Sequence, residues 1–278
     1  MSNSHPIKVI AVTGGKGGVG KSSITLNLAV AIADKNRKVL LLDADLGLAN
    51  IDVMLGLKAP RNLTHVLEGQ CRLEDILLEG PSGLKIVPAS SGTQKMSQLS
   101  LAENAGIIQS FSELSDNVDY LFIDTAAGIS DNVLSFLQAS QDIVLVVCDE
   151  PTSIADSYAL MKILSQKFNR KRFRVIANMA HSPADGKRVF SKITKVADKF
   201  LDVSLDFVGM IPFDDNIRKA IKKQKPLVHL TPRSPASVAI KNISNKVINW
   251  RVPNVPQGNI EFFMERLLNN KKMTVENI

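Results

Sequence analysis

The sequence predicts an α/β fold with three layers, in which a mostly parallel central sheet has helices on both faces. Short apolar runs rich in β-branched residues alternate with longer segments of helical periodicity almost to the end of the 278 residues. Such alternation favours parallel strands joined by right-handed helical crossovers. Because no internal repeat, low-complexity tract or linker interrupts the pattern, we expect a single domain over residues 1–278.

The individual elements follow from the same pattern. Seven strands are expected, each a short and largely apolar run: Ile7–Val12, Lys38–Leu42, Leu84–Pro88, Asp119–Asp124, Asp142–Cys148, Phe173–Asn178 and Leu205–Ile211. Helices are expected between them, where apolar residues recur at helical spacing: Ser22–Ala33, a short turn at Ile51–Leu55, Leu101–Leu114, Ser130–Ser140, Thr152–Phe168, Asp185–Phe200, Asp214–Lys223 and Pro235–Asn249.

A glycine-rich run joins the first strand to the first helix. From Gly15 to Ser22 it reads G-x-x-x-x-G-K-S, which is the spacing of a phosphate-binding P-loop. Glycines let the backbone turn its N–H groups toward phosphate oxygens, and the helix N-terminus adds positive potential. Lys21 is expected to reach the β- and γ-phosphates, and the Ser22 hydroxyl to ligate Mg²⁺. The run predicts a nucleoside triphosphate site formed by Gly15, Lys16, Gly17, Gly18, Val19, Gly20, Lys21, Ser22 and Ser23.

Lys16 is a second lysine inside this loop, and the simplest P-loop has no role for it. One interpretation is a solvated surface lysine. The other depends on its reach, because a lysine that extends from this loop can contact a phosphate of a nucleotide bound across a dimer interface.

The first acidic site follows the strand expected at Lys38–Leu42. Asp43 and Asp45 are alternate residues of an extended segment, so their side chains can share one face. A triphosphate with Mg²⁺ needs carboxylates to hold the metal and to position water. The alternative is a local role in helix capping, because Asn50 or Asp52 can start the short turn that follows.

The second acidic site is Asp124, which ends four apolar residues in a Walker B pattern. It is expected to bind Mg²⁺ through water, so the predicted metal site consists of Ser22, Asp43 and Asp124. Gly128 follows at a place where a backbone N–H can sense the γ-phosphate. The four histidines show no spacing typical of metal ligands.

The charge balance is basic, with a formal net charge of +7 and a pI of about 9.4. Lysines and arginines gather at Lys167–Arg174 and Arg218–Lys225. Such patches can meet DNA, anionic lipid or an acidic protein, and they can also be solvated surface. The chain has only two cysteines, and Cys148 at the end of an apolar strand is expected to be a buried thiol. Without a signal peptide or a membrane-spanning run, we expect a cytoplasmic protein.

The C-terminal segment 259–272 carries an apolar stripe at helical spacing and is expected to form an amphipathic helix. The stripe consists of Ile260, Phe263, Met264, Leu267 and Leu268, with Phe262 at its edge. A helix of this kind can lie in a membrane interface, at the inner membrane or the cell pole. It can equally pack on the domain as a last core helix, and the sequence leaves both possibilities open.

The three motifs in this order resemble the MinD/ParA family of ATPases over nearly the whole chain, because Lys16–Ser22 matches the "deviant Walker" signature K-G-G-x-G-K-[ST]. The resemblance implies that ATP and Mg²⁺ are the cofactors and that Lys16 acts in trans in an ATP-bound homodimer. It also implies that Asp45 orients the attacking water, with Lys16 and Lys21 as the other catalytic residues, while Asp43 lies nearer the Mg²⁺ shell. No C-x-x-C occurs, which argues against relatives of this fold that bind iron–sulfur clusters.

Loops in the second half of the chain carry further residues that match this family. In related ATPases an asparagine and a proline-containing loop contact adenine, which points to Asn178 and Pro212. The local alternatives are a turn residue and a strand terminator. Glu150, after the strand at Asp142–Cys148, is expected to contact the nucleotide or the partner subunit, and Thr152 to cap the next helix.

Four stretches resemble the FleN/FlhG group within this family, which sets flagellar number in bacteria: residues 43–50, 62–69, 149–153 and 260–267. The resemblance implies a slow, regulatory ATPase that dimerises with ATP and restrains a FleQ-type enhancer-binding activator. It implies the FlhF GTPase as a further partner, although only Met1–Pro6 precede the first strand and the D-Q-A motif that stimulates this GTPase is absent. A MinD-like cell-division ATPase or a ParA-like DNA-partitioning ATPase is the alternative, and direct DNA binding is less expected.

Overall fold

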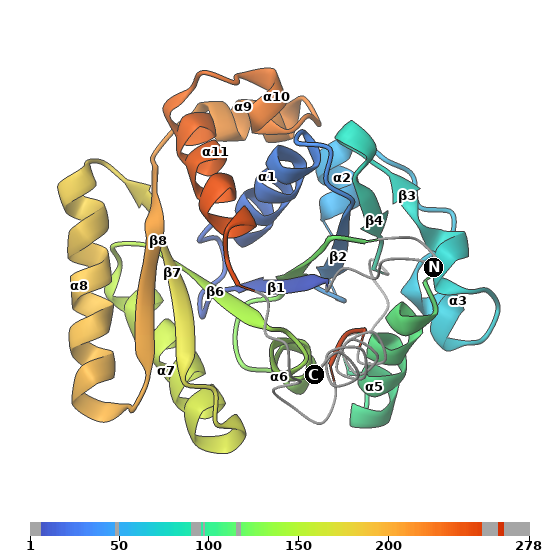
Figure 1. The fold of residues 1–278 in the computed structure, drawn as a ribbon, viewed down its shortest axis with the longest axis horizontal. Helices are drawn as coiled ribbons and strands as arrows, with labels where there is room; N and C mark the ends of the chain where they lie inside the picture. Colours follow the sequence, from blue (N-terminus) through green and yellow to red (C-terminus); the bar gives the residue numbers. More distant parts are fainter. Residues whose placement is uncertain are drawn as a thin grey trace, which may run out of the picture.

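The chain, seen in a computed structural model, is built around one eight-stranded sheet with the strand order β3-β4-β2-β5-β1-β6-β7-β8 (Figure 1). The structure describes residues 7–47, 50–89, 96, 98–114, 118–251 and 261–263. All paired strands are parallel except β3, which runs antiparallel to β4. The three-layer α/β fold predicted from the sequence is confirmed.

The strands are β1 Lys8–Thr13, β2 Val39–Ala44, β3 Leu78–Glu79, β4 Lys85–Val87, β5 Tyr120–Thr125, β6 Asp142–Val147, β7 Arg172–Ala180 and β8 Ser204–Pro212. All seven expected strands form, within a few residues of their predicted ends. The two-residue β3 was not predicted, because a run of that length carries no periodicity. The order places β1 between β5 and β6, so the loop after β1 lies at the topological switch point, where the strand order reverses. Open α/β sheets bind their ligands at this point.

The helices are α1 Lys21–Ala33, α2 Ile51–Leu55, α3 Leu63–Leu67, α5 Leu101–Ser110, α6 Asp131–Gln138, α7 Pro151–Phe168, α8 Pro183–Phe200, α9 Asn216–Lys222, α10 Leu227–Leu230 and α11 Pro235–Ile248. Short 3₁₀ turns lie at Leu73–Ile76, Pro81–Gly83 and Phe111–Glu113. Sequence periodicity missed α3 and α10, which are only one turn long. At α7 the helix begins at Pro151 with Glu150 in the N-cap position, so the expected cap by Thr152 is wrong.

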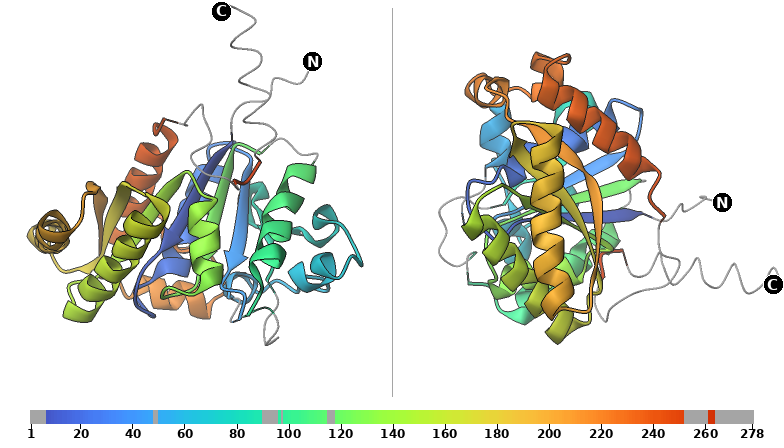
Figure 2. Two further views of the ribbon diagram at one scale, coloured as in Figure 1. Left: turned by 90° about the horizontal axis from the view of Figure 1, so that it is seen from below. Right: turned by 90° about the vertical axis from the view of Figure 1, so that its left-hand side faces the viewer.

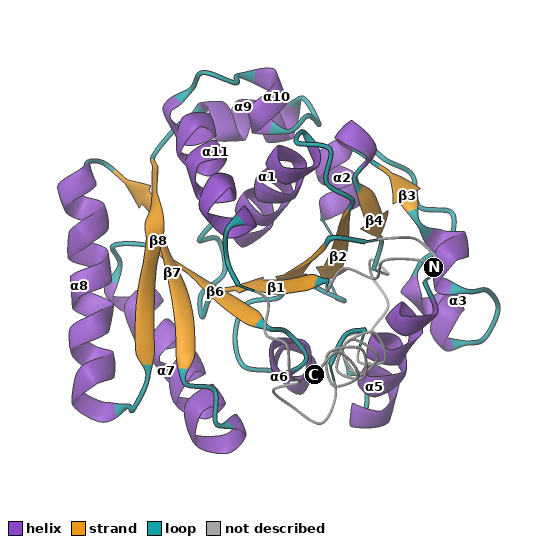
Figure 3. Cartoon of the chain, viewed as in Figure 1, coloured by secondary structure: helices purple, strands orange, loops and turns teal. Residues whose placement is uncertain are grey.

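The sheet separates two apolar cores. Strand β1 alternates between them, with Val9 and Ala11 on one side and Ile10 and Val12 on the other. One core lies beneath α5 to α8, and the other beneath α1, α10 and α11 (Figures 2 and 3). Nearly every residue of α1 is buried, because this helix is enclosed between the sheet and α11. The helix that follows the P-loop is therefore fixed in place by packing on both sides.

Residues 261–263 form a turn on the α5–α6 side of the sheet instead of part of the expected helix, with Phe263 at φ 57°. Phe262 and Phe263 are each 1% exposed, and the Phe262 ring lies 4.9 Å from that of Phe111, edge to face. These three residues are docked in the core; the other residues of 259–272 lie outside the described part. No described helix is long and apolar enough to cross a membrane.

Candidate functional site

The glycine-rich run lies between β1 and α1, as predicted, and two of its glycines are required by their surroundings. Gly20 adopts φ 92°, a left-handed conformation that other residues avoid, and a Cβ there would lie 2.5 Å from the Asn178 amide nitrogen. A Cβ on Gly15 would lie 2.3 Å from the backbone of Asp156 in α7. The loop is therefore closely packed between β7 and α7, and its shape depends on residues without side chains.

The two lysines of the loop have different surroundings. Lys21 is 8% exposed, and burial lowers the pKa of its ammonium, while the charges of Asp124 and Asp45 oppose this shift. Lys16 is partly exposed and forms an ion pair with Glu150 of the same chain, which raises the pKa of Lys16. Lys21 thus points into the site, whereas Lys16 lies at its rim.

Strand register brings the two predicted metal carboxylates together, because Asp43 on β2 pairs with Asp124 on β5. Each is 1% exposed. Burial and mutual repulsion raise the pKa of Asp43 to about 8, and burial above all raises the pKa of Asp124 to about 7. A divalent cation beside two buried carboxyl groups that resist ionisation would stabilise their charged forms.

Asp43 also caps helix α2. Its Oδ2 accepts hydrogen bonds from the backbone N–H groups of Asn50 and Ile51, at 2.8 and 2.9 Å. The Asn50 side chain, in the N-cap position, makes no capping bond. The metal and capping interpretations of this segment are therefore not exclusive, because one carboxylate serves α2 and lies beside Asp124.

Asp124 is held by two hydroxyl groups of α1. The Ser22 hydroxyl bonds to it, and the Thr25 Oγ1 donates to its Oδ1 at 3.2 Å. Thr25 was not predicted as a site residue. The signal was available, because residues three apart on a helix share a face and Ser22 was already placed in the metal site.

Asp45 is half-buried, and its charge acts on both Lys21 and Asp124. Its backbone N–H donates to Asp43 Oδ1 at 3.3 Å. Gly128, after β5, has φ 97°. Asp43 and Asp124 lie near the ends of β2 and β5, so the segments after both strands begin next to these two carboxylates.

The residues proposed for adenine are only partly brought together. Asn178 at the end of β7 is 3% exposed, and its Nδ2 donates to the carbonyl of Val19 at 2.7 Å. Its Oδ1 is buried without a hydrogen-bond partner in the described residues. Pro212 is in register with Ala180, but it lines a groove between β8 and α11 on the side of Val208. Asn178 thus has a free acceptor beside the loop, and Pro212 faces elsewhere.

The residues present fit a nucleotide with Mg²⁺. The orphaned Asn178 acceptor suits an exocyclic amino group, and the left-handed glycines give a backbone cradle for phosphate. Mg²⁺ is usually held by one or two carboxylates together with phosphate oxygens, and Asp43 and Asp124 are two carboxylates of the kind that would hold it. Cys148 is buried, as expected, and burial raises the pKa of its thiol to about 11, so it is unreactive.

Comparison with known proteins places the chain among P-loop NTPases. The ParA family model, described as an NUBPL iron-transfer P-loop NTPase, matches residues 6–248. The antiactivator FleN of Pseudomonas aeruginosa is 58% identical over 268 residues, which is 96% of each chain. The flagellum site-determining protein YlxH of Helicobacter pylori is 34% identical, over 96% of this chain and 92% of YlxH. The MinD structure from Pyrococcus horikoshii with Mg-ADP has TM-score 0.71 at 25% identity, over 88% of this chain and 97% of that one.

Proposed function

This chain belongs to the MinD/ParA family of P-loop ATPases, and on that premise we propose that it is an ATP-dependent, dimerising regulator of flagellar number and biosynthesis. Its cofactors are ATP and Mg²⁺. The observation that carries the flagellar role is the identity of 58% to FleN, which extends over nearly the full length of both chains. FleN is named as an antiactivator, so we infer that this chain restrains a FleQ-type transcriptional activator.

In this proposal, ATP supplies the phosphoanhydride bond that is cleaved, and Mg²⁺ neutralises charge on the phosphates. The P-loop backbone and Lys21 bind the phosphates. Ser22, Asp43 and Asp124 hold the metal, and Thr25 fixes the orientation of Asp124. Asp45 positions the attacking water. Asn178 accepts from the base through its unpaired Oδ1.

Lys16 is the residue that links nucleotide to dimerisation. It leaves its ion pair with Glu150 and contacts the nucleotide of a second subunit. This ion pair is partly solvent-exposed, so separating its members costs little free energy. Asp43 meanwhile holds the start of α2, and a cation at Asp43 therefore acts on the segment that follows β2.

The test is an ATP-dependent dimerisation assay. We expect Lys16→Ala to bind ATP normally and to remain monomeric in size-exclusion chromatography with light scattering, while the control Lys195→Ala dimerises like the parent chain. A normal ATP dimer in the Lys16→Ala variant would exclude this role for Lys16.

The partner is tested with purified components. The Asp45→Ala protein, loaded with ATP, should retain a purified FleQ-type activator, and the same protein with ADP should not. Retention of nonspecific DNA instead would favour the ParA-like alternative, and binding to liposomes alone the MinD-like one. The FlhF GTPase is a further proposed partner for the same assay, and peripheral membrane contact through segment 259–272 remains a proposal.

A further inference from the structure

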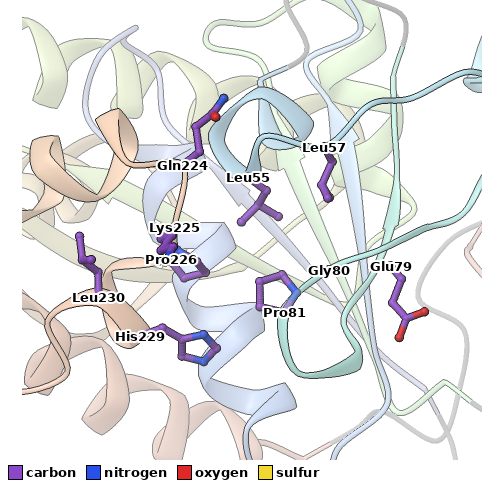
Figure 4. A pocket seen from close by; sticks show the side chains of 10 residues that line it. All are labelled: Leu55, Leu57, Glu79, Gly80, Pro81, Gln224, Lys225, Pro226, His229 and Leu230. Atoms are coloured by element: carbon purple, nitrogen blue, oxygen red, sulfur yellow. The ribbon is translucent and has the colours of Figure 1, made fainter.

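An open groove lies away from the carboxylate pair, between α2, the turn before β4 and α10 (Figure 4). Its volume is about 560 Å³. Leu55 and Leu57 lie on one side, Pro226 and Leu230 on another, and Pro81 of the turn before β4 adds to the apolar lining. These side chains come from three separate segments of the chain, so the groove exists only in the folded protein.

The rim of the groove adds exposed apolar surface. Val53 on α2 is 58% exposed and Ile221 on α9 is 41% exposed. Gln224 joins them: its Nε2 donates to the carbonyl of Val53 at 3.0 Å, and its backbone N–H donates to the carbonyl of Ile221 at 3.0 Å. Gln224 lines the groove, so these bonds place the exposed residues Val53 and Ile221 next to it in the fold.

The same edge carries cations without acidic partners. The cationic residues of α9 and the turn after it are all exposed, and in the described part of the chain none forms a salt bridge: Arg218, Lys219, Lys222, Lys223 and Lys225. Lys225 lines the groove itself. The lining has one acid, Glu79, and the nearby Asp34 is already bonded to His229 and Ser82. The surface is thus apolar at its centre and positive along one side.

We propose that this groove docks an acidic, amphipathic segment of a partner protein, with apolar anchors between α2 and α10 and carboxylates against α9. Helix-in-groove binding of this kind uses apolar anchors for affinity and charge for orientation. Nucleic acid is disfavoured, because the centre of the surface offers leucine and proline side chains where phosphate contacts would need polar groups. The exposed lysines and arginine of α9 and the turn after it would attract carboxylates, so the proposed segment is acidic.

The position of α2 connects the groove to the nucleotide site. Asp43 holds the N-terminus of this five-residue helix, the opposite end of the helix supplies Leu55, and Leu57 follows two residues later. A change in the bonds of Asp43 would therefore act on the helix that supplies one side of the groove. This coupling rests on the proposed function, whereas peptide binding does not, and we expect the affinity for the peptide to differ between ADP and a non-hydrolysable ATP analogue.

The test starts from a phage-displayed library of random peptides about twelve residues long, a length that forms three helical turns. Selected peptides should combine Asp or Glu with large apolar residues. In fluorescence anisotropy, the double variant Lys222→Glu, Lys223→Glu should weaken their binding about tenfold. The matched control Lys195→Glu, Lys199→Glu on α8, also exposed, should bind like the parent chain.

A second pair separates apolar docking from charge alone. Val53→Ser with Ile221→Ser removes exposed side chains that the core does not need, and should weaken binding about fivefold. The proposal is overturned if the charge-reversed protein binds the peptides as tightly as the parent chain. It is also overturned if the reversal abolishes binding to a DNA duplex or to phosphatidylglycerol vesicles and leaves peptide binding intact. Loss of ATP dimerisation in the charge-reversed variant assigns the surface to a second copy and also overturns it. If the charge-reversed variant binds the peptides like the parent chain while its ATP dimerisation and hydrolysis are normal, the docking proposal fails and the proposed function does not.

Discussion

The nucleotide edge and the cationic groove both carry lysines, yet they hold them in opposite ways. At the nucleotide edge, Lys21 is buried and Lys16 is paired with Glu150. At the groove, Lys222, Lys223 and Lys225 are exposed and form no salt bridge within the described residues. A buried cation such as Lys21 suits one small ligand of defined geometry. Exposed cations beside an apolar trough suit a peptide whose details vary, so the two regions differ in how much substitution they tolerate.

The largest expected effect is at the nucleotide edge. Asp45→Ala should lower the rate of ATP hydrolysis about a hundredfold or more, because positioning of the attacking water is lost, while ATP binding persists. Phosphate release under single-turnover conditions measures this. Asp52→Ala removes a carboxylate from the next helix and serves as the control, with a rate near that of the parent chain. Undiminished turnover in Asp45→Ala would contradict the catalytic role of Asp45. It would also show that the nucleotide edge tolerates substitution as well as the groove does.

A smaller effect concerns stability in the absence of ligands. Unfolded Asp43 and Asp124 titrate near 3.8, but folded they titrate at about 8 and about 7, so the folded chain holds protons that the unfolded chain releases. The free energy of unfolding therefore falls as pH rises from about 4 to about 8. Asp124→Asn should raise it by about 1–3 kcal/mol at pH 8 and flatten this pH dependence.

Urea unfolding at several pH values measures the effect. Asp202→Asn, at an exposed carboxylate bonded to Lys171, should leave the pH dependence over this range unchanged. If Asp124→Asn keeps the full slope of the parent chain, the buried carboxylate pair is not its source.

The smallest expected effect tests the second hydroxyl on Asp124. Thr25→Val keeps the shape of the side chain but removes the 3.2 Å bond to Asp124 together with the 2.8 Å bond to the carbonyl of Lys21, and should weaken Mg²⁺-dependent hydrolysis about tenfold. Thr64→Val is the matched control, because the Thr64 hydroxyl is buried without a partner in the described residues. A loss of equal size in both variants would point to a general packing defect instead of a positioning role.

The sequence predicted the nucleotide edge better than any other region, because its chemistry is encoded in consecutive residues. The spacing Gly15 to Ser22 and the acids after two strands identified Lys21, Asp43 and Asp124, which the structure brings together, although their roles stay predictions. Thr25 was missed because it lies outside the glycine-rich motif, although its position three residues after Ser22 on the same helix could have identified it. The capping of α2 by Asp43 was missed because it joins residues seven and eight positions apart across an irregular loop.

The groove could not be predicted for a related reason. Leu55, Pro81 and Pro226 meet only after the sheet has formed, and none carries a local pattern. The run Arg218–Lys225 was visible as a basic patch, but the sequence does not show that its cations border an apolar groove. Short elements such as α10 lie below the length at which periodicity can be recognised.

Phe262 and Phe263 have a practical consequence for anyone who shortens this chain. Truncation after Arg251 would be the natural way to ask what the C-terminal segment does, but it would also remove two aromatic side chains from the core beside Phe111. Removal of one buried phenylalanine ring costs about 3–5 kcal/mol, which is comparable to the whole stability of many domains. A cut after Phe263 leaves the aromatic cluster intact, and only that version separates loss of a binding segment from loss of the fold.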